Sequence, residues 1–599
     1  MPRPPLTGVP RRAALAALFL AACAPDERAG VHDPAAALLA PGDAPARSVA
    51  AGPPQRWSDP ATWGGRLPAA GANVTIPAGR TVVLDVSPPA LGALTIDGAL
   101  RFGDADLELA ATSILVNGTL SIGTAERPHL RRATIALVGD PTEEAAPGLG
   151  VKALAVRGTG TLDLHGAPRV SWGKLDATAP AGATTLTLDR PVDWQPGDRI
   201  IVTATGFDAR ETEEATVRTV SGASVTLAAP LRHAHWGQRS TVGGRTLDER
   251  AEVGLLSRTV RVTTRFGADS LLGGHAIFTD RATVRVSGVE FSHLGQPGRL
   301  GRYPFHWHLM GSAPGSYLRR SSVPRSLQRG IIVHGTSDTQ IEDNVIHDVR
   351  GHGVYVEDGS ERNVLIARNL ASLAQEVRRE HILQGPTRED RHGGTDQRAS
   401  NFWFATANLR VVDNVAAGSV HGFGFWYDLA TGNGHHPRDH ANSYVMGEFR
   451  GNSAHSQGAH PHTMQDYHPM ESGSGLRFDG GDFRGVFREF KAWKNMNAGA
   501  WFNCGQTVEA SVLAGNRIGA LTYCFQGEGG TFAGTLRHTV VASATPNTAG
   551  VASLRAFFRS RDHRPQSQFH GVVQDRRIVP HTYPVVRTTR LDRVTRVGF

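Results

Sequence analysis

Cysteine is scarce in this sequence, with three residues among 599, and this excludes a disulfide-dense scaffold and a multi-finger zinc protein. Long apolar runs are also missing, because the longest one lies near the N-terminus and is too short to span a bilayer. Lysine is rare as well: four of the 63 basic residues are Lys, which leaves 59 Arg. In contrast, 40% hydrophobic content excludes global disorder, and 69 glycines favour strands and turns.

The formal net charge of +8 has two interpretations. Abundant Arg, Ala and Gly are typical of a GC-rich genome, in which case the charge carries no function. Alternatively, the arginines serve an acidic partner, because a guanidinium fork binds carboxylate and phosphate in a bidentate way. The sequence contains no nucleic-acid-binding motif and no single basic stripe, so we expect no nucleic-acid partner. An acidic polysaccharide fits the charge at least as well.

The N-terminus has the pattern of an export signal. Arg3, Arg11 and Arg12 precede the apolar residues 13–22, which end in a lipobox-like Leu-Ala-Ala-Cys. We expect residues 1–22 to be a lipoprotein signal peptide, Cys23 to be lipidated, and residues 23–55 to be a flexible tether. Ala24 favours the outer membrane or cell surface of a Gram-negative bacterium, with the lipid as the only membrane contact. The alternative is an ordinary signal peptide with a chance cysteine.

A repeat dominates the chain beyond residue 255. Short strands begin at Gly330, Gly353, Gly424, Gly475, Gly499 and Gly519, which are 23, 71, 51, 24 and 20 residues apart. Asparagines that suit tight corners recur between them, and stacked amide side chains can bond to one another. One short strand per corner, coiled and stacked, is typical of a parallel β-helix, which we expect to be right-handed. Insertions are expected at about 374–400, 428–445 and 456–473.

The two remaining cysteines, Cys504 and Cys524, are 20 residues apart, close to one repeat. They would lie on neighbouring coils, near enough for a disulfide in an exported protein. Two buried thiols are an equally good interpretation.

Candidate catalytic residues fall at the ends of these strands. His306 and His308 alternate with aromatics, so both imidazoles should share one face of a strand. Aligning Gly335 with Gly359 places His334 beside Asp358, with Glu357 flanking them and Asp428 further along the same column. Such a column suits acid–base chemistry or a cation: oxygen donors favour calcium and histidines favour a transition metal, so the metal is left open. The alternative is that these polar groups only satisfy turn backbone.

Further residues are candidates for binding sugar. Arginines of the first insertion would pair with uronate carboxylates, and aromatic rings would stack on sugar faces, although aromatics of a β-helix are also often core. His455 begins a histidine-rich stretch that would bind sugar hydroxyls or a metal, unless it is a solvated loop. The substrate-binding candidates are Arg378, Arg379, Arg391, Trp403, Trp426, Tyr427 and His455.

The sequence resembles the G8-domain cell-surface hyaluronidase family, which includes the cell migration-inducing and hyaluronan-binding protein, transmembrane protein 2 and fibrocystin-like proteins. The resemblance covers about residues 56–525. The segments that carry it include residues 57–63 (WSDPATW), 160–166 (GTLDLHG), 194–199 (WQPGDR), 250–258 (RAEVGLLSR), 289–295 (VEFSHLG), 301–309 (GRYPFHWHL), 357–363 (EDGSERN), 402–405 (FWFA) and 452–456 (NSAHS).

Short β-runs with regular turn signals predict an all-β chain, with a β-rich module over residues 56–170, a connecting β segment over 171–255 and the parallel β-helix over 256–540. Residues 541–599 would form a C-terminal β segment or cap. The resemblance implies that the first module is a G8 domain followed by a parallel β-helix, and it implies Ca2+-dependent endo-cleavage of hyaluronan. The insertions at 374–400 and 456–473 look particular to this chain.

Two chemistries are open at the expected site. Hydrolysis would use two carboxyl groups flanking the bond, with Glu357 or Asp358 paired with Asp428. Elimination would use His334 or His308 as the base that removes a proton next to the uronate. The resemblance favours hydrolysis. A non-catalytic, glycan-binding adhesion protein is the competing class, because repeat solenoids often only bind.

Overall fold

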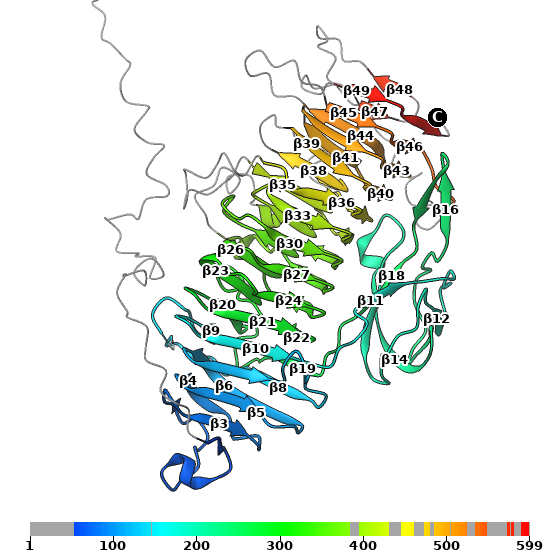
Figure 1. The fold of residues 1–599 in the computed structure, drawn as a ribbon. Helices are drawn as coiled ribbons and strands as arrows, with labels where there is room; N and C mark the ends of the chain where they lie inside the picture. Colours follow the sequence, from blue (N-terminus) through cyan, green and yellow to red (C-terminus); the bar gives the residue numbers. More distant parts are fainter. Residues whose placement is uncertain are drawn as a thin grey trace, which may run out of the picture.

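The computed structural model describes residues 53–144, 146–383, 395–429, 445–459, 472–479, 484–503, 505–523, 534–547, 572–574, 577–579 and 589–597. The strands stack in parallel coils, most of which have three strands, so the predicted parallel β-helix is confirmed (Figure 1). We name the three columns of stacked strands ladder 1, ladder 2 and ladder 3. Helical turns in the described ranges are the short η2 (Pro60–Trp63), η3 (Ala209–Glu211), η4 (Arg379–His381) and η6 (Thr395–Arg398).

Ladder 1 runs from one end of the described chain to the other. Its strands are β1 (Gln55–Arg56), β3 (Thr81–Leu84), β5 (Ala99–Phe102), β7 (Thr119–Ile122), β10 (Thr161–His165), β21 (Thr283–Ser287), β24 (Tyr317–Arg319), β27 (Gln340–Glu342), β30 (Val364–Ala367), β33 (Leu409–Val412), β36 (Glu448–Arg450), β39 (Gly485–Arg488), β42 (Gln506–Glu509), β45 (Gly534–Arg537) and β49 (Thr589–Asp592).

Ladder 2 follows ladder 1 in each coil. Its strands are β8 (Ala133–Val138), β19 (Val260–Arg265), β22 (Val289–Ser292), β25 (Ser322–Ser326), β28 (Val345–Arg350), β31 (Leu370–Gln375), β34 (Val415–Ser419), β37 (Ser453–His455), β40 (Lys491–Trp493), β43 (Val512–Ala514), β46 (Val540–Ala542) and β50 (Thr595–Val597).

Ladder 3 completes the coil. Its strands are β9 (Ala153–Val156), β20 (His275–Phe278), β23 (Phe305–Ser312), β26 (Ile331–Ser337), β29 (Val354–Val356), β32 (Phe402–Phe404), β35 (Phe425–Asp428), β38 (Leu476–Asp479), β41 (Ala498–Asn503) and β44 (Ile518–Tyr523), against which the antiparallel β47 (Val572–Gln574) and β48 (Arg577–Val579) pair. In the first coils β2 (Val74–Ile76) and β4 (Leu91–Ile96) lead to the long β6 (Leu107–Val116), which pairs with both β8 and β9.

The first coils, for which the G8 resemblance implies a separate module, belong to the same stack as the later ones. β10 pairs in register with β21 across more than a hundred residues of sequence, and β9 pairs with β20. One apolar core runs through both parts, filled by the inward-facing residue of every second position. The stack therefore begins near residue 55 and not near residue 256.

Residues 171–255 form a side domain that interrupts this stack. Its antiparallel sheet contains β11 (Trp172–Lys174), β12 (Thr185–Thr187), β13 (Arg199–Val202), β14 (Glu213–Ser221), β15 (Ser224–Leu227) and β18 (Glu252–Leu255), beside the hairpin β16 (Arg239–Val242) and β17 (Arg245–Asp248). Figure 1 shows it lying alongside the later coils. It packs on the outer face of ladder 2, where Ile201 contacts the cluster of Val345 and Leu370. Because the side domain packs on ladder 2, it leaves ladder 3 available for the candidate functional site.

An asparagine ladder holds the corner between ladders 1 and 2. The side-chain Nδ2 of Asn344, Asn369 and Asn414 donates to the Oδ1 of the next asparagine, ending at Asn452, over 2.9–3.0 Å. The predicted stacking of corner amides is therefore confirmed. The left-handed backbone lies one residue earlier than expected, with φ of 56°, 55° and 55° at Asp343, Arg368 and Asp413. Among the helices of these described ranges, none is long and apolar enough to cross a membrane.

Candidate functional site

Three neighbouring strands of ladder 3 bring the predicted catalytic residues together. In β23 the core takes Phe305 and Trp307, so His306 and His308 face outward, as the alternation predicts. The register places His308 level with His334 of β26. Val333 is level with Val356 of β29, which puts Glu357 on the next rung of the same row. Residues from coils some 25 positions apart thereby share one site.

Tight turns directly after the histidines set the direction of their side chains. Leu309 and Gly335, the residues that follow His308 and His334, both have φ of 53°, in the left-handed region. Leu309 is an unusual residue for this conformation, which costs energy for any side chain with a Cβ. Glycine is required at 335, because a Cβ there would lie 2.7 Å from Leu309 Cδ2 and 3.2 Å from Asp358 Oδ2.

The three imidazoles form a compact cluster. The Nδ1 atoms of His308 and His334 are 3.0 Å apart, and one ring nitrogen from each of the three histidines lies within 4.8 Å of the others. His306 is fully buried, and its Nδ1 lies 3.1 Å from the carbonyl oxygen of Gly301. His308 is the most exposed member, so the cluster lies at the boundary between the interior and the solvent.

Carboxylates surround the imidazole of His334. Its Nε2 is 3.3 Å from Asp358 Oδ1, and its Nδ1 is 3.9 Å from Glu357 Oε2. The expected contact with Asp358 is therefore present, but the strand register differs by one residue from the alignment of Gly335 with Gly359. Glu357 is level with His334, and Asp358 contacts it from the turn that follows. The chain between Glu357 and Leu365 holds two more residues than the chain between His334 and Gln340, its partner in ladder 1.

Glu361 is a member of the site that sequence reasoning missed. Its buried carboxylate accepts hydrogen bonds of 2.9 Å from the backbone N–H groups of Gly335, Asp358 and Gly359. It thereby ties the turn after His334 to the turn that carries Asp358. The sequence feature that could have identified Glu361 is its position in the segment 357–363, which carries the family resemblance and lies one coil beyond Gly335.

Burial and neighbouring charge have opposite effects on the pKa of His334, but they act in the same direction at His306 and at Glu361. Burial would lower the pKa of His334, but the three carboxylates beside it raise it to about 9. Burial, together with the two other imidazoles, keeps the pKa of His306 well below its usual value. Burial and the charge of Asp358 raise the pKa of Glu361 to about 7.

The aromatic candidates divide between the two faces of ladder 3. Trp403 and Trp426 face outward in the same row as His306, but both are buried, in a cluster with Tyr303, Tyr355 and Leu383. Tyr427 points the other way, into the core, where it stacks on Phe478. A sugar-stacking role for Tyr427 is therefore wrong, because alternate residues of a strand face opposite sides.

His455 lies away from this site, in ladder 2. It is buried against the side domain, with its Nε2 3.1 Å from Glu252 Oε2 and its ring stacked on Trp493. Lys174 Nζ is 3.0 Å from the other carboxylate oxygen of Glu252. The expectation that His455 contacts sugar is corrected, since these contacts join the side domain to the β-helix.

Asp428 lies further along the site row. Phe404 is level with Tyr427, so Ala405 separates the rung of Glu357 from that of Asp428. Asp428 is buried. Arg378 and Arg379 are exposed at the start of η4, whereas Arg391, Cys23, Cys504 and Cys524 lie outside the described residues.

The segment around η4 and η6 is fastened beside the cluster. Arg329 forms a buried bidentate ion pair with Asp396, at 2.8 and 3.1 Å, and lies over the ring of Tyr355 at 3.9 Å. His381 lies close to the loop that contains Gly298 and Gly301, because a Cβ on Gly298 would be 3.5 Å from His381 Cα. The carbonyl of Gly301 in this loop contacts His306. The exposed arginines therefore stand on a chain segment that adjoins the site.

Calcium, which the family resemblance implies, does not fit the histidine cluster. Calcium takes six to eight oxygen ligands, whereas the closest converging donors here are three imidazole nitrogens. Nitrogen donors of this kind suit zinc and its neighbours.

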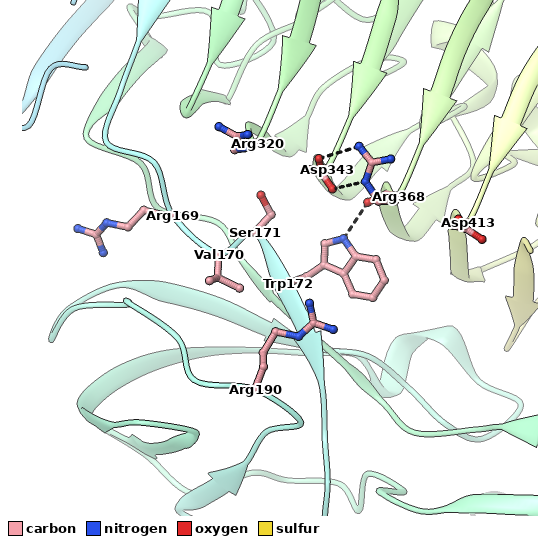
Figure 2. A pocket seen from close by; sticks show the side chains of 9 residues that line it. All are labelled: Arg169, Val170, Ser171, Trp172, Arg190, Arg320, Asp343, Arg368 and Asp413. Atoms are coloured by element: carbon pink, nitrogen blue, oxygen red, sulfur yellow. Dashed lines mark hydrogen bonds and ion pairs between the residues drawn. The ribbon is translucent and has the colours of Figure 1, made fainter. Parts of the chain in front are cut away.

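A cavity of about 410 Å³ lies where the side domain meets the corner of the β-helix (Figure 2). None of its lining residues belongs to the histidine cluster. Three of its four arginines are paired with carboxylates: Arg169 with Asp198, Arg190 with Asp189, and Arg368 with Asp343 and Glu342. Trp172 Nε1 donates to the carbonyl of Arg368 across the cavity. The cavity is therefore part of the interface between the side domain and the β-helix.

Comparison with known proteins agrees with this architecture. The family model described as a G8 domain matches residues 62–176, and the one described as a CEMIP beta-helix matches residues 271–461. Human fibrocystin-L is 34% identical over 507 residues, covering 75% of this chain and 12% of that protein. Protein rliB of Dictyostelium discoideum is 28% identical, covering 67% of this chain and 37% of that protein.

The chain belongs to the family of proteins that combine a G8 domain with a CEMIP β-helix. It spans well under half of the length of these relatives. Among solved structures, the tailspike gp61 of Pseudomonas phage phi297 has a TM-score of 0.23 and 11% identity, covering 76% of this chain and 66% of that one. The gp54 tailspike of Acinetobacter baumannii bacteriophage AP22, solved with a capsular saccharide, has a TM-score of 0.22 and 9% identity, with 75% and 64% covered.

Proposed function

We propose that this protein binds an acidic polysaccharide of the hyaluronan type and depolymerises it by endo-hydrolysis at the cluster around His334. The observation that carries the proposal is the convergence of three imidazoles and three carboxylates at one edge of ladder 3. Burying so many ionisable groups together is costly, and such clusters are concentrated at functional sites. The fold itself needs no such cluster, because the apolar core and the asparagine ladder already hold the coils.

The charge around the site supports an acidic substrate. Arg378 and Arg379 are exposed on the segment fastened beside the cluster, and a guanidinium fork suits a uronate carboxylate. The surplus of basic residues over the whole chain acts in the same direction, by attracting a polyanion at long range.

For hydrolysis, we propose Glu357 and Asp428 as the pair of carboxyl groups. Both occupy the outward row of ladder 3, two rungs apart. Two rungs amount to roughly 9–10 Å of backbone spacing. This is close to the separation of about 6.5–9.5 Å that inverting glycosidases use to place a water beneath the sugar. Asp358, which contacts His334, is the alternative partner of Asp428.

Elimination is a second candidate, and the contact between His308 and His334 favours it. Because its pKa is raised to about 9, His334 is protonated near neutral pH, so His308, 3.0 Å from it, is the base that would remove the proton next to the uronate carboxyl group. The products separate the two chemistries, since only elimination leaves an unsaturated uronate that absorbs in the ultraviolet.

The test is to incubate the purified protein with hyaluronan, chondroitin sulfate and a neutral glucan. Chain length is followed by size-exclusion chromatography and unsaturated product by ultraviolet absorbance. We expect shorter hyaluronan chains without new absorbance. Absorbance rising with cleavage would replace hydrolysis by elimination. Unchanged length for every polymer, with retention on a hyaluronan column, would identify a binding protein instead.

Two further proposals concern the setting of the site. We propose that lipidation of Cys23 anchors the protein at the outer membrane or cell surface, supported by the lipobox-like residues 20–23. Changing Cys23→Ala should move the protein from the membrane fraction to the soluble fraction. Calcium dependence is supported by the family resemblance alone, and is tested by chelation followed by addition of Ca2+ in the hyaluronan assay.

A further inference from the structure

The histidine cluster has the geometry of a metal site. Two nitrogens bound to one tetrahedral zinc ion at ~2.0–2.1 Å lie roughly 3.3 Å apart. The Nδ1 atoms of His308 and His334 are 3.0 Å apart, and a ring nitrogen of His306 lies within 4.8 Å of them. We propose that His306, His308 and His334 bind one transition-metal ion of the zinc class through three nitrogens.

The tautomer of His306 supports this assignment. A carbonyl oxygen can only accept, so the contact with Gly301 means that Nδ1 of His306 carries the proton. The neutral ring therefore presents an unprotonated Nε2. This atom is fully buried and has no hydrogen-bond partner among the described residues. Leaving such a buried group without a partner is unfavourable. A hydrogen bond between His308 and His334 would explain their contact but not the state of His306, whereas a metal ion explains both.

The outer contacts are those of metal-binding histidines. Such residues usually donate their other ring N–H to a carbonyl or a carboxylate, which fixes the ring. His306 makes this contact with Gly301, and His334 places its Nε2 3.3 Å from Asp358. Glu361 in turn fixes the backbone of Asp358 and of Gly335. The ring of His306 is thus held by its hydrogen bond to Gly301, and the ring of His334 lies at ion-pair distance from Asp358.

The ligand set also indicates the type of site. Structural zinc sites have four protein ligands, whereas three protein ligands leave a position for water or substrate. Glu357 lies beside the cluster, with its Oε2 3.9 Å from Nδ1 of His334. Nearby carboxylates balance the charge of a divalent ion, and the nitrogens discriminate against Ca2+.

This inference concerns the same cluster as the proposed function, but it stands on the geometry alone. Its test measures the metal and not the polysaccharide, so either proposal can fail without the other. The full-length protein is stripped with a chelator and then titrated with Zn2+ against a chromophoric competitor. Co2+ serves as a spectroscopic probe, because tetrahedral cobalt gives intense visible bands.

We expect one equivalent of Zn2+ per chain and the tetrahedral spectrum with Co2+, neither displaced by excess Ca2+. His306→Ala and His308→Gln should weaken Zn2+ binding by at least about 100-fold. His233→Ala, a partly exposed histidine of the side domain, should bind like the unchanged protein. Circular dichroism checks the fold, and His308→Gln keeps the test valid if the buried His306 variant does not fold. Less than one equivalent in the unchanged protein, displacement by Ca2+, or unchanged binding by folded His308→Gln would overturn the proposal.

Discussion

His308 and His334 meet at the ends of neighbouring strands, with their Nδ1 atoms 3.0 Å apart, although 26 residues separate them in sequence. His308 is the base of the elimination candidate, and for hydrolysis it lies in the same row of ladder 3 as Glu357. Because general acid–base groups and their neighbours contribute about 10²–10⁴-fold to a rate, His308→Ala should slow hyaluronan cleavage at least about 100-fold. His308 is partly exposed, so the variant should keep its melting temperature. Initial rates and thermal melts of this variant and of His233→Ala provide the check. Equal rates for the two variants would contradict a role for His308.

Glu361 should be needed for the stability of the site turns. Its carboxylate accepts three backbone N–H groups, whereas the amide of Glu361→Gln offers one oxygen and directs its own N–H groups at donors. We expect a loss of about 2–4 kcal/mol in the free energy of unfolding, measured by urea denaturation. The exposed Glu143→Gln is the matched control, and equal stability of the two variants would refute this role.

The asparagine ladder should be sensitive to a single break. Asn414 accepts two hydrogen bonds from Asn369 and donates to Asn452 and to the carbonyl of Ile366. Asn414→Ala leaves these buried partners unsatisfied, and we expect it to lower the free energy of unfolding by roughly 3–5 kcal/mol. The control is Asn408→Ala, outside the ladder. A loss no greater than that of the control would show that water replaces the lost bonds.

Docking of the side domain should depend on pH through Glu214. Burial would raise the pKa of Glu214, but hydrogen bonds and charges from His347 and Arg325 lower it to about 2. A lowered pKa contributes stability that is present above the ordinary value of 4.5 and is lost as the pH falls toward 2.

Melting temperatures measured between pH 3 and pH 7 for the unchanged protein and for Glu214→Gln test this ion pair. We expect the unchanged protein to be more stable near neutral pH by about 1–2 kcal/mol, with the difference shrinking below pH 4.5. A difference that stays constant over this range would show that the charge of Glu214 contributes nothing.

Much of the fold could be predicted from local patterns in the sequence. Strand-opening glycines at intervals near one coil and the corner asparagines are enough to predict stacked coils, because every coil repeats the same backbone geometry. The alternation in residues 305–308 correctly placed two histidines outward. The same rule, applied to residues 425–428, would have assigned Tyr427 to the core.

The predictions that were wrong concern contacts between residues far apart in the sequence, which no local sequence pattern reveals. The one-residue error in aligning His334 arose because the turns after β26 and β29 differ in length, which glycine positions alone do not reveal. His455 is fixed by Glu252 of the side domain, some 200 residues earlier in the chain. The continuity of the first coils with the later ones likewise required the pairing of β10 with β21.

The most direct test of the proposed site is to digest fluorescent hyaluronan with the unchanged protein, with Asp358→Asn and with His233→Ala, and to compare chain lengths over time. Asp358→Asn keeps the shape of the side chain but removes the charge beside His334. We expect the unchanged protein and His233→Ala to shorten the polymer, while Asp358→Asn remains folded and leaves the chains at full length. Shortening by Asp358→Asn at the rate of the unchanged protein would show that the cluster around His334 is not the site of cleavage.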